Sequence, residues 1–303
     1  MDTVKRVFYA IAEDNLHTRR EIAESLSLSV VSVGKAIKAL ISAGVLESCE
    51  KNHSESGRRS EIVEISRIAR VLLIDLTQID LAYSLSPLTE PFAHLRKLTY
   101  VDSLDFEGNL SLLISDARRH IANKPMKIAV ALPGDVDGGR IANSYATDYS
   151  GFDVMDALSD SGLFPDIFVS GAAAVEGARD FAEGDVFISA GSTVWGAFGR
   201  DKVEHLGGVP VDNSGMLTYS DALRCSYADE SVLKYSKRFL RAINGIISPI
   251  RILFSCELLS KEAKSELQSE IPNAVCVSAH ETVLDGLMEL VRDQILEEIA
   301  RKQ

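Results

Sequence analysis

TRREIAESLSLSVVSVGKAIKALISAGVLESCEKNHSESGRR, residues 18–59, is the stretch around which the rest of this chain is organised. Its first part predicts a short helix. Thr18 precedes Glu21 by three residues, as in a capping box, and Ile22, Ala23 and Leu26 then fall on one face. A serine-rich turn follows, so a second helix at an angle to the first is expected.

The second helix is predicted from Ser29, a suitable N-cap, to Gly44, which can take the positive φ that ends a helix. Its buried stripe is expected at Val33, Ile37, Leu40 and Ile41. The opposite face carries short or basic side chains, namely Ser29, Val30, Ser32, Lys35, Ala36 and Lys38. Such side chains suit a helix that enters the major groove of DNA by its N-terminal half.

Two strands are predicted after this helix, at residues 45–46 and 62–65, around a charged loop. The loop carries Arg58 and Arg59 beside Gly57, and adjacent arginines suit contacts with phosphates or the minor groove. Arg19 and Arg20, at the start of the first helix, are also placed to contact phosphates. The order of these pieces predicts a winged helix-turn-helix. The alternative is a helical hairpin used for packing, with a solvated loop.

Charge is distributed unevenly along the 303 residues, whose net charge is −12. Residues 1–70 hold 11 Lys and Arg against 10 Asp and Glu, while the remainder holds 21 against 34. DNA would repel the acidic part but not the near-neutral one. The pattern favours a DNA-binding N-terminal unit that faces away from an acidic body.

The composition excludes several other classes. Hydrophobic residues make up 46% of the chain, enough for a large core, and no apolar run is long enough to cross a membrane. The N-terminus lacks the apolar segment of a secretory signal, and the four cysteines show no paired spacing. We therefore expect reduced thiols in a cytoplasmic protein.

Strands and helices alternate from residue 70 onward, which predicts an α/β body with a substantially parallel sheet. The clearest strands are VLLIDL (71–76), KIAVALPG (127–134), DIFVSGA (166–172), DVFISAG (185–191) and PIRILFSCEL (249–258). Residues 281–300 predict a long final helix, whose apolar residues are expected to pack internally. No internal repeat is evident from the periodicity.

The order of these pieces resembles the ROK family, named for repressors, open reading frames and kinases. The resemblance rests on the segment SGRRS (56–60), VLLIDL (71–76), IAVALPGDVDGGRIANS (128–144), ISAGSTVWGAF (188–198) and LGGVPVDNSG (206–215). It implies a winged helix-turn-helix over residues 1–67 and a two-lobed body of the actin-like, sugar-kinase fold over residues 68–303. The lobes are expected at roughly 68–183 and 184–303.

The resemblance also implies that catalysis is lost. Family kinases have a glycine-containing phosphate turn after the first strand, whereas here Asp75 is followed by Leu76-Thr77-Gln78. The family's catalytic aspartate corresponds to Ser170-Gly171, neither of which can act as a base. Its zinc ligands are missing around Gly208, and Trp195 is expected to fill space where a nucleotide would lie. We expect no catalytic residue, cofactor or metal.

Ligand binding stays open at this stage. Asn143 falls where family members keep a sugar-contacting asparagine, and Asp148 and His205 are polar and near the expected cleft by analogy. A sugar, another small ligand and no ligand are all retained, and a lone Asn after a hairpin is more often a turn residue.

The sequence thus predicts a transcription regulator, a repressor, that binds operator DNA as a homodimer or higher homo-oligomer. The alternatives are a ROK-type sugar kinase or sugar sensor, and a module whose winged helix binds protein.

Overall fold

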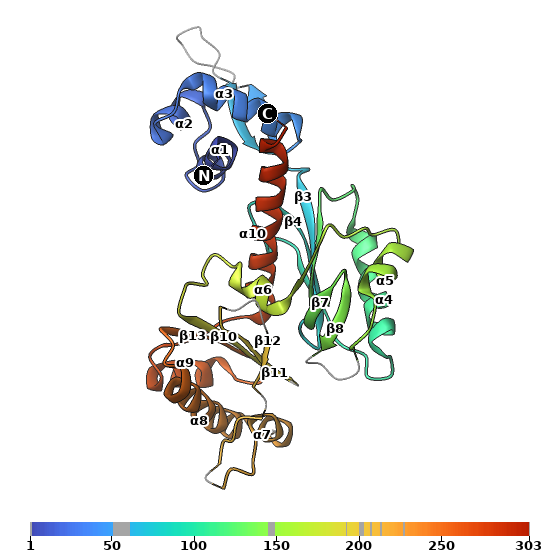
Figure 1. The fold of residues 1–303 in the computed structure, drawn as a ribbon, viewed down its shortest axis with the longest axis vertical. Helices are drawn as coiled ribbons and strands as arrows, with labels where there is room; N and C mark the ends of the chain where they lie inside the picture. Colours follow the sequence, from blue (N-terminus) through green and yellow to red (C-terminus); the bar gives the residue numbers. More distant parts are fainter. Residues whose placement is uncertain are drawn as a thin grey trace.

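The computed structural model describes residues 2–50, 61–144, 149–191, 193–199, 203–206, 208–212, 214–226 and 228–302, with the backbone alone for residues 50, 61 and 203–205. Three parts follow one another along the molecule (Figure 1): an N-terminal head at one end, a first lobe, and a second lobe at the other end. The long helix α10 (Ala279–Ala300) runs from between the lobes to the head.

The head consists of three helices and a strand pair: α1 (Thr3–Ala12), α2 (Arg19–Leu26), α3 (Val30–Ser42), β1 (Leu46–Glu50) and β2 (Glu61–Ile65). The capping box of Thr18 and Glu21 is confirmed, Ser29 caps α3, and Gly44 has φ +74° after its end. β1 and β2 pair antiparallel. Each local signal therefore starts or ends the element predicted from it. Arg58 and Arg59 lie outside the described residues.

The first lobe is built on a five-stranded sheet of order β5-β4-β3-β6-β9, in which only β3-β6 and β6-β9 are parallel. Its strands are β3 (Arg70–Asp75), β4 (Leu81–Pro87), β5 (Leu95–Leu98), β6 (Ile128–Leu132) and β9 (Ile167–Ser170), and a separate hairpin is formed by β7 (Gly134–Asp137) and β8 (Arg140–Ser144). Along β3, Leu72 and Ile74 face α4 (Phe106–His120) and α5 (Val154–Asp160), whereas Val71 and Leu73 belong to the core around α10. Both faces of this sheet are thus buried.

The second lobe repeats this plan with a sheet of order β12-β11-β10-β13-β14, again with only the last two pairings parallel. Its elements are β10 (Asp185–Ala190), β11 (Val194–Ala197), β12 (Val203–His205), α7 (Tyr219–Cys225), α8 (Asp229–Ile247), β13 (Arg251–Cys256), α9 (Lys261–Glu270) and β14 (Ala274–Cys276). The short helix α6 (Gly171–Glu176) joins the lobes. The expectation of a substantially parallel sheet is therefore wrong: the body has two mixed sheets of the same design, in each of which two pairings are parallel and two antiparallel.

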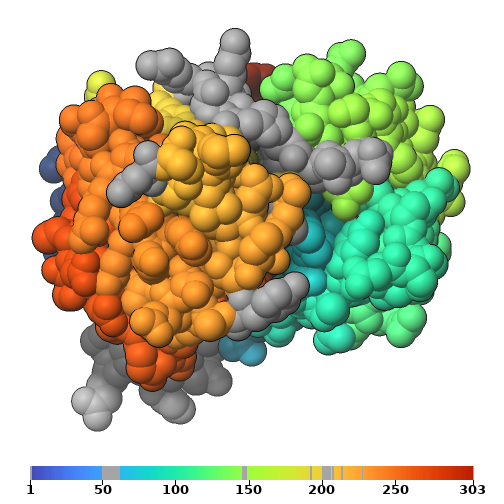
Figure 2. Space-filling view, turned by 90° about the horizontal axis from the view of Figure 1, so that it is seen from below, coloured from blue at the N-terminus to red at the C-terminus, as the bar shows by residue number. Residues whose placement is uncertain are grey.

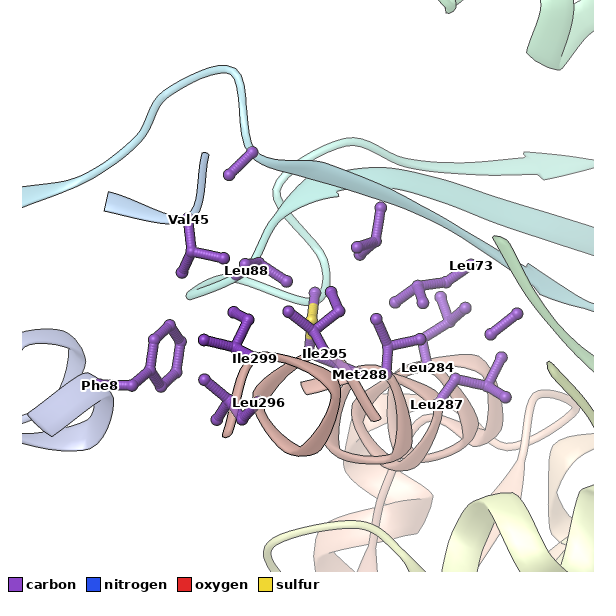
Figure 3. Packing of buried hydrophobic residues seen from close by; sticks show 14 of the residues in the cluster. Phe8, Val45, Leu73, Leu88, Leu284, Leu287, Met288, Ile295, Leu296 and Ile299 are labelled. Carbon is purple, nitrogen blue, oxygen red and sulfur yellow. The ribbon is translucent and has the colours of Figure 1, made fainter. Parts of the chain in front are cut away.

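The core around α10 is continuous from the head to both lobes. Figure 3 shows Phe8 and Val45 of the head next to Leu296 and Ile299 of α10, with Leu73 of β3 beside Leu284 and Leu287 further along the helix. Salt bridges add to this contact, because Lys5 Nζ lies 2.9 Å from Asp293 Oδ1 and 3.4 Å from Glu297 Oε1. The predicted internal packing of the last helix is confirmed.

Some boundaries differ from those expected. The sequence AAVEGARDF (173–181) favours a helix throughout, but α6 ends at Glu176, and α7 and β12 were not predicted. Among the described residues, no single helix is long and apolar enough to span a membrane, and the only candidate is the pair α2 and α3, which is bent by 118°.

Candidate functional site

A cavity of about 350 Å³ lies between the lobes, where the turn after β3 meets the turn between β10 and β11. Its lining includes Gln78 and Asp80 from the first lobe and Ser189, Thr193 and Arg224 from the second. Viewed from below (Figure 2), the second lobe in orange and the first lobe in green and teal lie on either side of a groove. This is the interlobe cleft of the molecule.

Side chains of the protein itself already bridge this cleft. The Ser189 hydroxyl donates to Gln78 Oε1 at 2.9 Å, and Gln78 Nε2 donates to Thr77 Oγ1 at 3.1 Å. At the edge, Lys97 Nζ lies 3.0 Å from Glu257 Oε1. The first lobe therefore contacts the second through polar groups across this cavity.

Asp75, the acidic residue shared with the family's first turn, is fully buried and engaged. Its Oδ2 lies 2.6 Å from Nδ1 of His280, in the first turn of α10, and its Oδ1 accepts a bond from the backbone N–H of Thr77 at 2.8 Å. His280 is itself 1% exposed. The carboxylate thus ties the end of β3 to the start of α10 and does not face the cavity.

Ser170, which the resemblance led us to expect in place of a catalytic base, is a helix cap. The Ser170 hydroxyl accepts a bond from the backbone N–H of Ala173 at 3.1 Å and begins α6. An alcohol has too high a pKa to deprotonate a sugar hydroxyl near neutral pH, and Gly171 has no side chain. Neither residue can supply a base, and neither lines the cavity.

Of the three predicted ligand-binding residues, only Asn143 has a described side chain, and it does not line this cavity. Asn143 is exposed on β8, and its amide donates to Asp135 Oδ2 on β7 at 3.1 Å, so it stabilises the hairpin. The hairpin strands approach closely, since a Cβ at Gly134 (φ +151°) would meet the Asn143 carbonyl oxygen at 1.8 Å. Asp148 lies outside the described residues, and for His205 only the backbone pairing with Trp195 is described.

Trp195 does not occupy the cleft, so that expectation is wrong. Its side chain is fully buried and packs on Phe187, with ring centroids 5.1 Å apart, in the core between the second sheet and α10. The neighbouring turn is tight, with the Gly191 N–H bonded to the Thr193 carbonyl at 3.0 Å. Within the described ranges, no cluster of three or more His, Cys, Asp or Glu residues is placed to hold a metal ion, and all four cysteines are free.

The head presents a second candidate surface, on α3. The axes of α2 and α3 are bent by 118° at a short turn, in which Ser27 takes a left-handed conformation with φ 53°. Arg19 crosses α3 at Gly34, where a Cβ would be 3.9 Å from its side chain. Arg20 is exposed and pairs with Glu24 at 2.8 Å, a surface contact that contributes little energy. Arg20 is therefore open to solution, whereas Arg19 is half-buried against α3.

The exposed face of α3 differs in part from the face predicted. Lys35 and Lys38 are exposed as expected, but Ala36 is 1% exposed and belongs to the core. Val31, which was not singled out, is 70% exposed, and Val30 is 53% exposed. Val31, Lys35 and Lys38 follow the spacing i, i+4 and i+7, so they form one outward stripe, which we call the α3 stripe. That spacing was visible in the sequence.

Both predicted hydroxyl groups at the start of α3 serve the helix itself. The Ser29 Oγ accepts from the Ser32 backbone N–H at 3.0 Å and lies 2.8 Å from the Ser32 Oγ. Each hydroxyl keeps some capacity for a further bond, but their orientation is fixed by the cap. The most accessible side chains of the first turn are thus the two valines.

Comparison with known proteins places this fold among ROK structures. No family model and no curated protein matches the sequence. A ROK family transcriptional regulator, described as a homologue of the E. coli MLC protein, is similar over 98% of this chain and 100% of its own, with 14% identity and a TM-score of 0.57. The body therefore has a mixed α/β fold resembling that of ROK proteins.

Two kinases are similar over a smaller share of the chain. A ROK family glucokinase from Streptomyces griseus, solved with glucose and AMPPNP, covers 74% of this chain with 13% identity and a TM-score of 0.52. An inorganic polyphosphate/ATP-glucomannokinase from Arthrobacter covers 78% with 14% identity and a TM-score of 0.50. These chains match over 99% and 100% of their own lengths, so the fold is shared by regulators and sugar kinases alike.

Proposed function

We propose that this protein is a DNA-binding transcription regulator whose head is a winged helix-turn-helix and whose ROK-like body is not a kinase. The observation that carries the proposal is the α3 stripe on the outer helix of a bent helix pair. An angle near 118° across a three-residue turn is in the range of helix-turn-helix units. The head would then read operator DNA with α3.

Three features support an assignment to DNA. The N-terminus of α3 is exposed, and its positive end favours a phosphate. Lys35 and Lys38 lie on the same face of α3 as Val31, and their long side chains can contact the phosphates of the DNA backbone beside the groove. Arg20 is exposed at the start of α2. The likeness to a regulator over 98% of the chain, head included, agrees with this assignment.

The assignment is tested by isolating genomic fragments on the purified full-length protein and measuring affinity for them at several salt concentrations. Lys35→Ala with Lys38→Ala is expected to weaken binding to all fragments and to make the slope of log K against log salt less steep by about two. Lys124→Ala with Lys261→Ala, two exposed lysines of the body, is the matched control. Equal slopes for the two double variants would refute α3 as the DNA-contacting helix.

A dimer is part of this proposal. Two heads related by a two-fold axis would bind half-sites one helical turn apart or a multiple of it, so the isolated fragments should contain symmetric half-sites. Sedimentation of the protein with a fragment carrying one or both half-sites measures the stoichiometry. A single monomer bound to the complete site would exclude this arrangement.

Kinase activity is the second candidate, and it is favoured by one observation: the cleft between the lobes persists, with a volume of about 350 Å³. Against it, Ser170 is a helix cap and Asp75 is buried on His280. We expect no hexose-dependent release of ADP from ATP over a panel of hexoses and N-acetylhexosamines. Turnover with any of them would reverse our interpretation of Ser170-Gly171. The hexose that is turned over would then be the first compound to test as an effector of DNA binding.

A further inference from the structure

The first turn of α3 exposes two adjacent apolar side chains that the fold itself does not use. Val31 is 70% exposed and Val30 53% exposed, although buried Val33 and Ile37 complete the core contacts of the same helix. Valine is a weaker helix former than alanine, because its branched Cβ restricts χ1. Two exposed valines at the start of a helix therefore add nothing evident to folding stability.

Their surroundings distinguish them from exposed apolar residues elsewhere. Val31 stands on the α3 stripe, ahead of Lys35 and Lys38 on the same face. Ser29 and Ser32 lie on either side of the valines in the sequence, and their hydroxyl groups take part in the hydrogen bonds of the helix cap. A partner at this place therefore meets methyl groups at the start of the stripe and cationic side chains one and two turns further along it, which suits an apolar group with anionic groups close by.

Duplex DNA offers such a group only once among its four bases. In the major groove, the 5-methyl group of thymine is apolar, whereas the remaining base-edge groups are hydrogen-bond donors and acceptors. Phosphates flank the groove on both sides. A short branched side chain at the start of a helix that enters the groove can contact this methyl group. Because it is short, it leaves the hydrogen-bonding groups of the neighbouring bases accessible.

We propose that Val31, with Val30 beside it, forms an apolar contact with the 5-methyl group of a thymine, so that each operator half-site carries a thymine facing the first turn of α3. This inference rests on the proposed function and adds the base that the helix selects. In this proposal the valines distinguish thymine from the other bases, whereas Lys35 and Lys38 contribute affinity for DNA of any sequence.

The experiment uses an enriched DNA fragment in which each thymine of a half-site is replaced in turn by deoxyuridine, which lacks the methyl group and pairs identically. At one position, the full-length protein is expected to bind about fourfold more weakly, the loss associated with one buried methyl group. Val31→Ala should bind the thymine fragment with a similar loss and should no longer distinguish thymine from uracil there. The two losses would then be non-additive, as expected for groups in contact.

Val101→Ala, which alters a 38% exposed valine of the first lobe, is the control and should keep full discrimination. The unfolding temperature of Val31→Ala should not fall, because the side chain is exposed and alanine is the better helix former. Equal affinity for every uracil fragment, or discrimination retained in Val31→Ala, would overturn the methyl contact while leaving DNA binding intact. Failure to enrich any DNA would overturn the proposed function and this inference together.

Discussion

The Asp75–His280 contact keeps the Asp75 carboxylate out of the cleft. Both side chains are buried, to 0% and 1% exposure, and they lie 205 residues apart in the chain. The carboxylate lies 2.6 Å from an imidazole nitrogen, accepts from the Thr77 N–H, is fully buried and does not line the cavity, so it is closed to a ligand there. The same acidic residue that would serve phosphate chemistry in a kinase-like turn here fastens two elements together.

Replacing Asp75 should therefore affect folding and not only ligand binding. Asp75→Ala leaves the His280 Nδ1 buried without its partner, which is expected to lower the free energy of unfolding by about 3 kcal/mol. Asp75→Asn keeps an acceptor of the same shape and should cost less. Urea unfolding of both variants, followed by Trp195 fluorescence, measures the difference. A loss in Asp75→Asn as large as that in Asp75→Ala would show that charge, and not the hydrogen bond, holds the contact.

Single residues were predictable from the sequence where their partners are local. The Thr18–Glu21 capping box and the Ser29 cap depend on residues three positions apart, so their pattern is complete within the stretch itself. The contact between Asp75 and His280 forms only because the tertiary fold brings β3 and α10 together, and no sequence spacing predicts it. Ala36 and Val31 were misassigned for a smaller reason: the buried residues of α3 are Val33, Ala36, Ile37 and Leu40, and the predicted stripe had Ile41, which is half-buried, in place of Ala36.

At the level of elements, the crossing of α6 and α10 is the closest contact between helices for which a glycine is required. A Cβ on Gly286 of α10 would lie 1.5 Å from the carbonyl oxygen of Ala174 in α6. Since α6 joins the lobes and α10 leads to the head, this crossing fixes how the three parts meet.

Gly286→Ala should accordingly be destabilising, although alanine is the better helix former. The backbone oxygen of Ala174 cannot rotate away, so the helices must separate, at an expected cost of at least about 2 kcal/mol. Gly245→Ala in α8 is the matched control: no atom lies within 4 Å of its Cβ position, and it should gain up to about 1 kcal/mol. Thermal unfolding of the two variants compares them directly. Similar shifts in both would contradict the close crossing.

Element type followed from periodicity, but strand pairing did not. The strands of both lobes were found as apolar runs, whereas the short elements α7 and β12 contain too few residues to establish a period. The repeated sheet order of the two lobes is a property of long-range pairing, and the two sets of strands reach it with unrelated side chains. For that reason the repeat was invisible in the sequence.

At the scale of the whole molecule, α10 makes the head part of the body's core. The apolar cluster that contains Phe8 and Val45 of the head continues through Leu296 and Ile299 to the first and second sheets. Ion pairs from Lys5 to Asp293 and Glu297 lie along the same face. The start of α10 carries His280, next to the cleft, and its last turns contact the head. α10 is therefore a continuous helix that connects the region between the lobes to the head, which carries the α3 stripe.

Cutting back this contact should loosen the head selectively. Leu296 is 1% exposed, and Leu296→Ala removes packing between α10 and α1 at an expected cost of about 3 kcal/mol. Leu267→Ala in α9 deletes the same atoms from an equally buried site, at 0% exposure, in the separate core of the second lobe. Because Leu296 supports the head and Leu267 does not, amide hydrogen exchange in α1 and α3 should accelerate by about a hundredfold in the first variant and change little in the second. Equal acceleration of exchange in both variants would mean that the head and the body unfold only together. The packing of α10 would then not stabilise the head separately from the body.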